Sequence, residues 1–195
     1  MKLRVESIDD IELISYTSER DNLSLKKLYL SWLNDTSVTE SIASPQLNSK
    51  KDMSFVEESF VRFSQKDCKG FFIYYVPEKV FIGTTKLDSI SSHNLSAWDG
   101  IMIGNKFFQG RGIAPKVYKI LLSFAFDNLK LRRISSGCNS NNIAMIKTFL
   151  HIGYTREGCL RKADNIGGTF SDHLYFGILR EEFFKKNHLN LIIEN

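Results

Sequence analysis

One stretch in the middle of the chain constrains the fold most strongly: an apolar run, a polar turn with two glycines, and a helical pattern. Residues 100–104 form an apolar run that is typical of a buried strand. Residues 105–111 are mostly polar and lead to Gly112, after which apolar residues recur every three or four positions to about Leu129. Pro115 fits this helix only in its first turn, where its missing N–H costs no helix hydrogen bond. The stretch therefore predicts a strand, a glycine-containing turn and a helix.

The turn has a chemical use as an anion site. The first N–H groups of a helix lack intrahelical partners, and the helix dipole adds partial positive charge there. Gly110 and Gly112 carry no side chains, so a phosphate can approach the backbone closely. Lys106, Arg111 and Lys116 are cations nearby. An ordinary strand-to-helix connection explains the same residues equally well, so the pattern alone leaves both interpretations open.

Two other phosphate-binding loops do not fit. The pair Gly110 and Gly112 lacks the third glycine of the dinucleotide fingerprint, because Pro115 stands in its place. The next expected strand, residues 133–137, has no acidic residue at its end to bind a ribose. The nucleotide P-loop pattern G-x-x-x-x-G-K-[ST] does not occur in the sequence.

Several segments resemble one enzyme family in order and spacing. Gln109-Gly-Arg-Gly112-Ile-Ala114 resembles the Q/R-x-x-G-x-G/A signature of the GNAT family of N-acetyltransferases, in which this loop binds the pyrophosphate of acetyl-CoA. Later segments resemble the ribosomal-protein-acetyltransferase-like (RimJ/RimL-type) branch. They are Asn142-Ile-Ala144, Thr148-Phe149, Ile152-Gly-Tyr154, Glu157-Gly158 and Gly168-x-x-x-Asp172. The resemblance covers roughly Leu23 to Leu179.

The resemblance implies an α/β GNAT fold. In this fold a mixed, mostly antiparallel and splayed sheet is flanked by helices, and acetyl-CoA occupies the V-shaped gap between two central parallel strands. The sequence pattern is compatible with it, because a helix separates the strand ending at Gly104 from the strand ending at Cys138, which makes these two strands parallel. The other expected strands are residues 3–5, 11–16, 71–76, 80–87, 154–162 and 170–179, and the other expected helices are residues 23–33, 52–64 and 143–152.

The resemblance also implies roles for individual residues, with acetyl-CoA as the acetyl donor. The pantetheine arm would pair with the backbone near Met102 and Ile103, and phosphates would bind amides of the glycine turn. Asn142 would hydrogen-bond the cofactor across the gap. The implied cofactor-binding residues are Met102, Ile103, Gln109, Gly110, Arg111, Gly112, Ile113, Ala114, Asn142, Met145 and Phe149.

The implied reaction is direct attack of a primary amine on the thioester, which needs a base and an oxyanion donor. The N–H of Met102 or Ile103 would stabilise the oxyanion. Many relatives carry an acid where this chain has Trp98. Asp99 is a candidate base, although an offset of one residue turns it to the opposite face unless a bulge restores it. Many relatives also have a tyrosine that protonates the thiolate, where this chain has Phe149.

Three further polar residues have side chains suited to proton transfer. Asp172 is the second candidate catalytic acid, and its alternative role is to orient the turn at residues 167–168. His93 lies at an expected hairpin tip and is interpreted as a solvated residue. His173 should point away from Asp172 and is interpreted as a core or surface residue.

The acceptor is expected to be a small-molecule amine such as an amino sugar nucleotide. Trp32-Leu-Asn-Asp35 and Gly137-Cys138 resemble family members from surface-polysaccharide pathways. Packing by Trp32 and a helix stop at Asn34-Asp35 explain the first of these segments equally well. One alternative is the N-terminal amine of a protein, as in ribosomal-protein acetyltransferases. The other is a non-catalytic CoA-binding module, which Phe149 and the lack of a clear base would explain.

Composition limits the remaining possibilities. The 195 residues predict a single domain, 1–195, and the net charge of +4 comes from scattered residues that predict no nucleic-acid binding. No apolar run reaches the length of a membrane span, and the N-terminus is unlike a signal peptide. The three cysteines lack metal-type spacing and predict reduced thiols, no metal and a cytoplasmic protein. The expected assembly is a monomer or homodimer.

Overall fold

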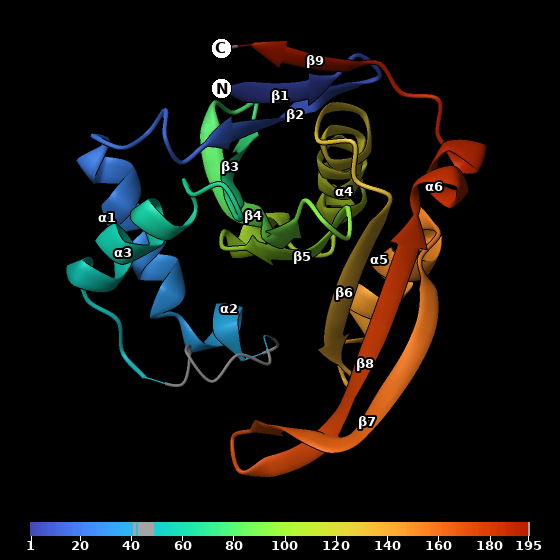
Figure 1. The fold of residues 1–195 in the computed structure, drawn as a ribbon. Coiled ribbons are helices and arrows are strands. Elements are labelled where there is room, and N and C mark those ends of the chain that lie inside the picture. Colours follow the sequence, from blue (N-terminus) through green and yellow to red (C-terminus); the bar gives the residue numbers. More distant parts are fainter. Residues whose placement is uncertain (41, 43–48, 195) are drawn as a thin grey trace.

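The fold, seen in a computed structural model that describes residues 1–40, 42 and 49–194, is a nine-stranded sheet with helices on both faces (Figure 1). The strand order is β7-β8-β6-β5-β4-β3-β2-β1-β9. The strands are β1 (Lys2–Val5), β2 (Ile8–Ser15), β3 (Lys69–Tyr75), β4 (Val80–Ser91), β5 (Ser96–Ile103), β6 (Arg133–Asn139), β7 (Thr155–Ile166), β8 (Thr169–Leu179) and β9 (Leu191–Glu194). The helices are α1 (Leu23–Leu33), α2 (Thr36–Thr39), α3 (Met53–Arg62), α4 (Ile113–Ser123), α5 (Ile143–Ile152) and α6 (Arg180–Lys186).

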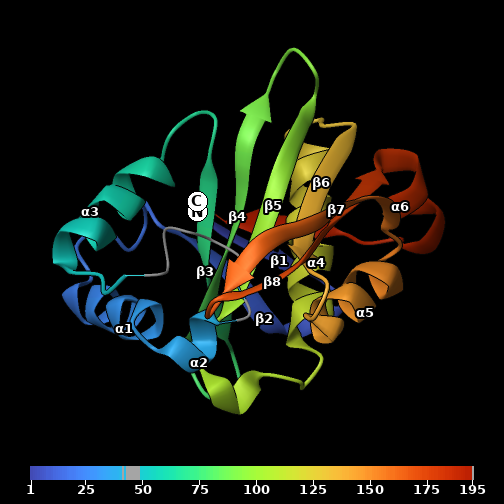
Figure 2. The same cartoon turned by 90° about the horizontal axis from the view of Figure 1, so that it is seen from below.

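The pairing confirms the expected mixed sheet. Strands β5 and β6 are parallel, whereas the other paired neighbours run antiparallel. The helices α1 and α3 cover one face of the sheet, and α4 and α5 cover the other (Figures 1 and 2). Within the described residues, no helix is both long and apolar enough to span a membrane.

Each face of the sheet has its own apolar core. Alternation along β3 shows this division, because Phe71 and Ile73 pack into the cluster that contains α4, whereas Phe72 packs with α1 and α3. All three side chains are fully buried. The two cores hold the sheet between the helix layers and fix which face each strand residue points to.

Glycine, proline and asparagine residues at the helix ends predicted the bounds of α4 and α5 correctly. Gly112 precedes α4 with φ +74°, and Pro115 is its third residue, in the first turn as predicted. The predicted extension to about Leu129 is also helical, although Phe124–Asn128 is a π-helical turn. Asn142 caps α5, and Gly153 ends it with φ 113°, as the capping pattern predicted.

The C-terminal segment forms a strand, β9, that the sequence pattern did not predict. Beyond α6, β9 pairs antiparallel with β1, so that Leu191 lies opposite Val5 and Glu194 opposite Lys2. The apolar residues near the C-terminus therefore extend the chain's own sheet. The final hairpin is longer than expected, but its turn lies at Gly167 and Gly168 as predicted.

The segment after α1 ties the helix layer to the end of β5. Trp32 is 5% exposed, and its ring lies against Gly104, where an added Cβ would be 2.1 Å from the ring atom Cδ2. Asn34 exchanges two hydrogen bonds with the backbone of Lys51. Asp35 caps α2 and pairs with Lys106 at 3.2 Å. These three polar and aromatic residues therefore have structural roles.

A methyl group at Gly104 should destabilise the fold, because the Trp32 ring fills the space that it would need. We expect Gly104→Ala to lower the free energy of unfolding by about 1–3 kcal/mol, as overpacking of a core does. Urea denaturation measures this. Gly100→Ala in the same strand is the matched control, because its nearest neighbour is the flexible Cε of Lys86 at 3.3 Å. Equal stability of the two variants would contradict the packing account.

Candidate active site

The two central strands part near the middle of the sheet. The strands β5 and β6 pair at Ser96–Arg133, Ala97–Ile134 and Trp98–Ser135, and their pairing ends there. A cavity of about 550 Å³ lies beyond this point, with Asp99 to Ile103 on one side and Ser136 to Cys138 on the other. This arrangement confirms the splayed sheet that the family resemblance implies.

Backbone alternation shows which groups of β5 face the gap. The carbonyl of Gly100 accepts from the hydroxyl of Thr85 on β4, and that of Ile103 accepts from Nε2 of Gln109 at 2.8 Å, away from β4. Backbone groups of alternate residues point to the same edge of a strand. The N–H groups of Ile101 and Ile103 therefore lie on the gap edge, whereas the N–H of Met102 points to β4. Of the two oxyanion donors expected, Ile103 has the suitable direction.

The glycine turn leaves open space at the start of α4. Gly110 and Gly112 have φ of +71° and +74°, and apart from their chain neighbours no described residue has an atom within 4 Å of a Cβ built on either. Gly112 provides no side-chain cap to the helix, so the first N–H groups of α4 receive no capping bond from it. The cavity between β5 and β6 is lined here by Gln109, Gly110, Gly112, Ile113 and Ala114. These residues fit a diphosphate group, because donors and open space coincide.

Two of the three cations expected to attract an anion to the glycine turn are instead paired with carboxylates. Lys116 pairs with Asp10 on β2, and Lys106 pairs with Asp35. Arg111 lies with its guanidinium 3.7 Å from the centre of the Phe107 ring and takes part in no ion pair with another described residue. Of the three cations near the turn, Arg111 is thus the one whose charge remains available to an anion.

The helix α5 lines the opposite side of the gap. Asn142 accepts a hydrogen bond from the N–H of Met145 through Oδ1, and both residues line the cavity. Phe149 also contributes to the lining but is 1% exposed, with its ring 5.2 Å from that of Tyr154 and 4.9 Å from that of Phe176. Phe149 is therefore a packing residue at the base of the gap.

Asp99 lies where the strands part, on the face of α4. Ser136 donates to its Oδ1 at 2.5 Å, Tyr118 donates to the same oxygen at 3.3 Å, and Tyr154 donates to Oδ2. Burial raises the pKa of Asp99 to about 6, although the hydrogen bonds from Ser136, Tyr154 and Tyr118 act in the opposite direction. The register from Gly83 to Asp88 on β4 is regular, so no bulge turns Asp99 to the face of Trp98.

The other sequence candidates lie outside the cavity. Asp172 accepts from the N–H of Lys162 at 2.9 Å and contacts the thiol of Cys159, so it holds the irregular part of β7. The turn at Gly168 is instead oriented by Asn165, whose Oδ1 accepts from the glycine N–H at 3.0 Å. His93 is exposed between β4 and β5.

A residue without a predicted role, His173, lines the cavity. Its Nδ1 lies 2.9 Å from Oδ2 of Asp164 on β7. Asn139, which is 1% exposed, donates to the same carboxylate oxygen at 3.1 Å. The signal available in the sequence was the alternation of β8, which places His173 and Tyr175 on the same face of the strand.

A second cavity, of about 620 Å³, lies between β4, β5 and the helices α1 and α3. It shares Gly100, Ile101 and Met102 with the first cavity. Its charged lining residues are Lys51, Glu58, Arg62, Lys86 and Asp88.

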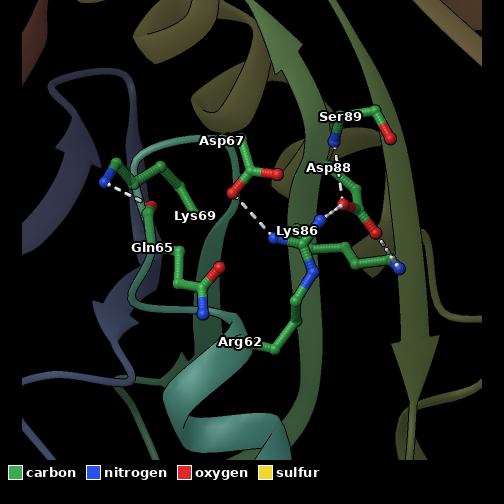
Figure 3. A network of polar contacts seen from close by, with 7 residues as sticks. All are labelled: Arg62, Gln65, Asp67, Lys69, Lys86, Asp88 and Ser89. Atoms are coloured by element: carbon green, nitrogen blue, oxygen red, sulfur yellow. Dashed lines mark hydrogen bonds and ion pairs between the residues drawn. The ribbon is translucent and has the colours of Figure 1, made fainter.

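A network at the rim of the second cavity neutralises one of its carboxylates (Figure 3). Arg62 donates to both Asp67 and Asp88, and Lys86 donates to Asp88 at 2.9 Å. Burial acts to raise the pKa of Asp88, but the bond from Lys86 and the charge of Arg62 leave it below its usual value. Arg62 and Lys86 are therefore paired with carboxylates, and Lys51 is the lining cation that forms no ion pair with another described residue.

The buried carboxylate of Asp99 should make stability depend on pH. Its pKa in the folded state is raised to about 6, so the folded protein holds this proton more tightly than the unfolded chain, and stability is lost as pH rises from about 4 through 6. Asp99→Asn removes that loss. We expect its stability relative to the wild type to improve by about 1–3 kcal/mol between pH 4 and 7.5. Urea denaturation at both pH values measures this, with the exposed Asp9→Asn as control. A difference that is independent of pH would contradict the assignment.

Among the described residues, no group of three or more His, Cys, Asp or Glu side chains is arranged to hold a metal ion.

Comparison with known proteins identifies the family. The model of the acetyltransferase (GNAT) domain matches residues 15–155. A probable N-acetyltransferase, YjcK of Bacillus subtilis, is 30% identical over 113 residues, which are 57% of this chain and 62% of that protein. The ribosomal-protein-serine acetyltransferase of Escherichia coli is 26% identical over 80% of this chain and 87% of its own length. The chain spans roughly half the length of most of the curated relatives that it matches.

A solved structure shows the same fold. Spermidine N-acetyltransferase from Vibrio cholerae, in complex with CoA and spermine, superimposes with a TM-score of 0.79 over 91% of this chain and 99% of its own, at 18% identity. A GNAT-family acetyltransferase from Bacillus anthracis gives a TM-score of 0.73 over 93% of this chain and 100% of its own, also at 18% identity. The splayed sheet, the glycine turn at the start of α4 and the match over residues 15–155 lead to one conclusion: the chain belongs to the GNAT family of N-acetyltransferases.

Proposed function

We propose that this protein transfers an acetyl group from acetyl-CoA to the primary amine of a small molecule, such as an amino sugar nucleotide. One observation carries the proposal: the two cavities meet at Gly100, Ile101 and Met102 of β5. The first cavity reaches the open start of α4, which suits the phosphates of the donor. The second is large enough for an acceptor. A thioester lying along the gap edge of β5 would thus be accessible to an amine from the other cavity.

In this proposal the donor is held by the backbone of β5 and the glycine turn. Ile101 and Ile103 pair with the pantetheine arm as an added strand would, and the turn from Gln109 to Ala114 binds the diphosphate. The residues Asn142 and Met145 form the opposite wall of the gap. Bound acetyl-CoA supplies the activated acyl group, and the chain supplies orientation and the oxyanion donor.

The chemistry requires two proton transfers. An alkylammonium ion has no lone pair, so it must lose a proton before its nitrogen attacks the thioester carbonyl. The N–H of Ile103 is directed to the gap and suits the oxyanion of the tetrahedral intermediate. When the C–S bond breaks, the remaining excess proton on nitrogen goes to the CoA thiolate. Phe149 cannot donate this proton, so the new thiol obtains it from the amine or from water.

One unpaired lysine in the lining of the second cavity suits an acceptor that carries an anionic group. Arg62 and Lys86 are paired with Asp67 and Asp88, whereas Lys51 forms no ion pair with another described residue. A polyamine would bring further positive charge to this lining, whereas a sugar nucleotide brings phosphates.

The single domain, the cytoplasmic location and the monomeric or dimeric state remain predictions from the sequence.

The proposal predicts acetyl-CoA turnover that depends on the acceptor. Release of the CoA thiol should be faster with amino sugar nucleotides than with spermidine, amino acids or peptides, by at least about tenfold in kcat/KM, which corresponds to about 1.4 kcal/mol. Acetylated peptides would favour the N-terminal protein alternative, and faster turnover of spermidine would contradict the charge argument. Binding of acetyl-CoA without turnover of any amine would favour the non-catalytic module.

Calorimetry with a matched pair of glycine variants tests the donor site separately. Gly112→Ala places a methyl group in the expected path of the phosphates and strains a backbone with φ +74°, so we expect the Kd for acetyl-CoA to rise about tenfold or more. Gly168→Ala is the control, because its φ is +86° and the space around it is equally open, but it lies outside both cavities. Equal affinities in the two variants would contradict the assignment of the turn.

A further inference from the structure

We propose that His173 is the general base that takes the proton from the acceptor ammonium, and that Asp164 orients it. This inference rests on the proposed acetyltransferase function and names the group that the function requires. Asp99 does not fill the role well, because it faces α4 and is enclosed by Ser136, Tyr118 and Tyr154.

The first step of the argument is the position of the imidazole. His173 lies on β8 opposite Asn139 of β6 and lines the cavity between β5 and β6. A Cβ built on Gly137 would lie 2.4 Å from its Nε2. The ring therefore extends over Gly137, towards the edge of β6 that faces the gap. The glycine at this position of β6 leaves room for the ring in this orientation.

The second step is the tautomer. Both carboxylate oxygens of Asp164 lie near Nδ1, at 3.1 and 2.9 Å. An ionised carboxylate only accepts hydrogen bonds, so Nδ1 carries the hydrogen and the neutral ring has its lone pair on Nε2. Nε2 is thus the atom that can accept a proton. It is also the ring nitrogen that lies over Gly137.

The third step is the support of Asp164. Asn139 donates to its Oδ2 at 3.1 Å and also bonds the hydroxyl of Ser171. The pairing of β7 with β8 shifts register between Leu160 and Asp164. Such an irregularity re-aims a side chain, and here it brings Asp164 to the ring of His173. Among the described residues, Asp164 is the one charged group within ion-pair distance of this histidine.

The fourth step is the face of the sheet. Trp98, Gly100 and Met102 share one face of β5 by alternation, and Met102 packs with the residues of α1 and α3 beside the second cavity. The ring of Trp98 lies 5.8 Å from that of Tyr175, which lies 5.0 Å from that of His173. His173 is therefore on the face from which the proposed acceptor approaches, whereas Asp99 is on the other.

The proton balance is complete without another reactant. The ammonium gives one proton to Nε2, and the imidazolium that forms keeps its Nδ1–H bond to Asp164 and passes the proton to solvent. The free amine attacks the thioester carbon, the C–S bond breaks, and the second proton from nitrogen ends on the thiol of CoA. The sum is ammonium plus thioester giving amide, thiol and one released proton.

Turnover of two amines distinguishes a base from a structural histidine. With an alkylamine that is protonated at the assay pH, we expect His173→Gln to lower kcat by about 100- to 10,000-fold, with little change in the KM for acetyl-CoA. With a weakly basic amine, such as a hydroxylamine analogue of the acceptor, the loss should fall below about tenfold, because no proton needs to be removed before attack. Added imidazole should partly restore His173→Ala. His93→Gln, at the exposed hairpin tip, is the control.

Two further variants test the positioning. Asp164→Asn should lower kcat without changing acetyl-CoA binding, because the amide can donate to Nδ1 and so favours the wrong tautomer. Gly137→Ala should have a similar effect, since its methyl group displaces the ring. Wild-type rates in His173→Gln, or equal losses with both amines and no rescue by imidazole, would overturn the assignment while leaving the acetyltransferase function intact. A wild-type protein that turns over no amine would overturn the proposed function and this role with it.

Discussion

Strands β5 and β6 form parallel hydrogen bonds over three residue pairs and then part, and the cavities and the side chains around them depend on this divergence. The backbone edge of β5 beyond Trp98 would ordinarily be buried by a neighbouring strand. Here it lines a cavity, so its N–H and C=O groups lack the strand partner that they would have in a continuous sheet. An extended ligand with amide groups, such as a pantetheine arm, satisfies such an edge in the way that a strand does.

The divergence is held by groups at its base. Asp99 of β5 accepts hydrogen bonds from Ser136 of β6 and Tyr118 of α4, which joins the parting strands to the helix that follows. Phe149 fills the space below with aromatic contacts. The raised pKa of Asp99 shows that burial outweighs these hydrogen bonds, so this carboxylate is kept at a cost to folding at neutral pH. Asp99 is therefore better placed to connect β5 with β6 and α4 than to take a proton from the acceptor.

Features that depend on neighbouring residues could be predicted from the sequence, and features that depend on distant contacts could not. Gly112, Pro115 and Asn142 act through the local backbone, and the alternation of β5 correctly turned Asp99 away from the face of Trp98. The Lys116–Asp10 ion pair and the pairing of β9 with β1 join segments far apart in the chain, which local patterns do not encode. The sequence left packing and acceptor binding open for Trp32, and only the position of Gly104 on a distant strand shows that its ring packs there.

The surroundings of His173 show most clearly that local patterns do not predict contacts between distant segments. Alternation predicts that His173 points away from Asp172, and the structure agrees, but it cannot predict the partner of the imidazole. That partner, Asp164, arrives through a register irregularity of β7, and the room for the ring comes from Gly137 on another strand. The positions of β6, β7 and β8 must therefore be known before the pair of His173 and Asp164 can be recognised.

The central claim is that acetyl-CoA completes the parted sheet along β5, and hydrogen exchange tests it most directly. With acetyl-CoA bound, the amides of residues 99–103 and of the turn at residues 110–114 should exchange more slowly, because they gain partners in the ligand. The amides of β1 and β9, at the far edge of the sheet, should be unaffected. Unchanged exchange along β5, or slower exchange confined to other strands, would contradict the account.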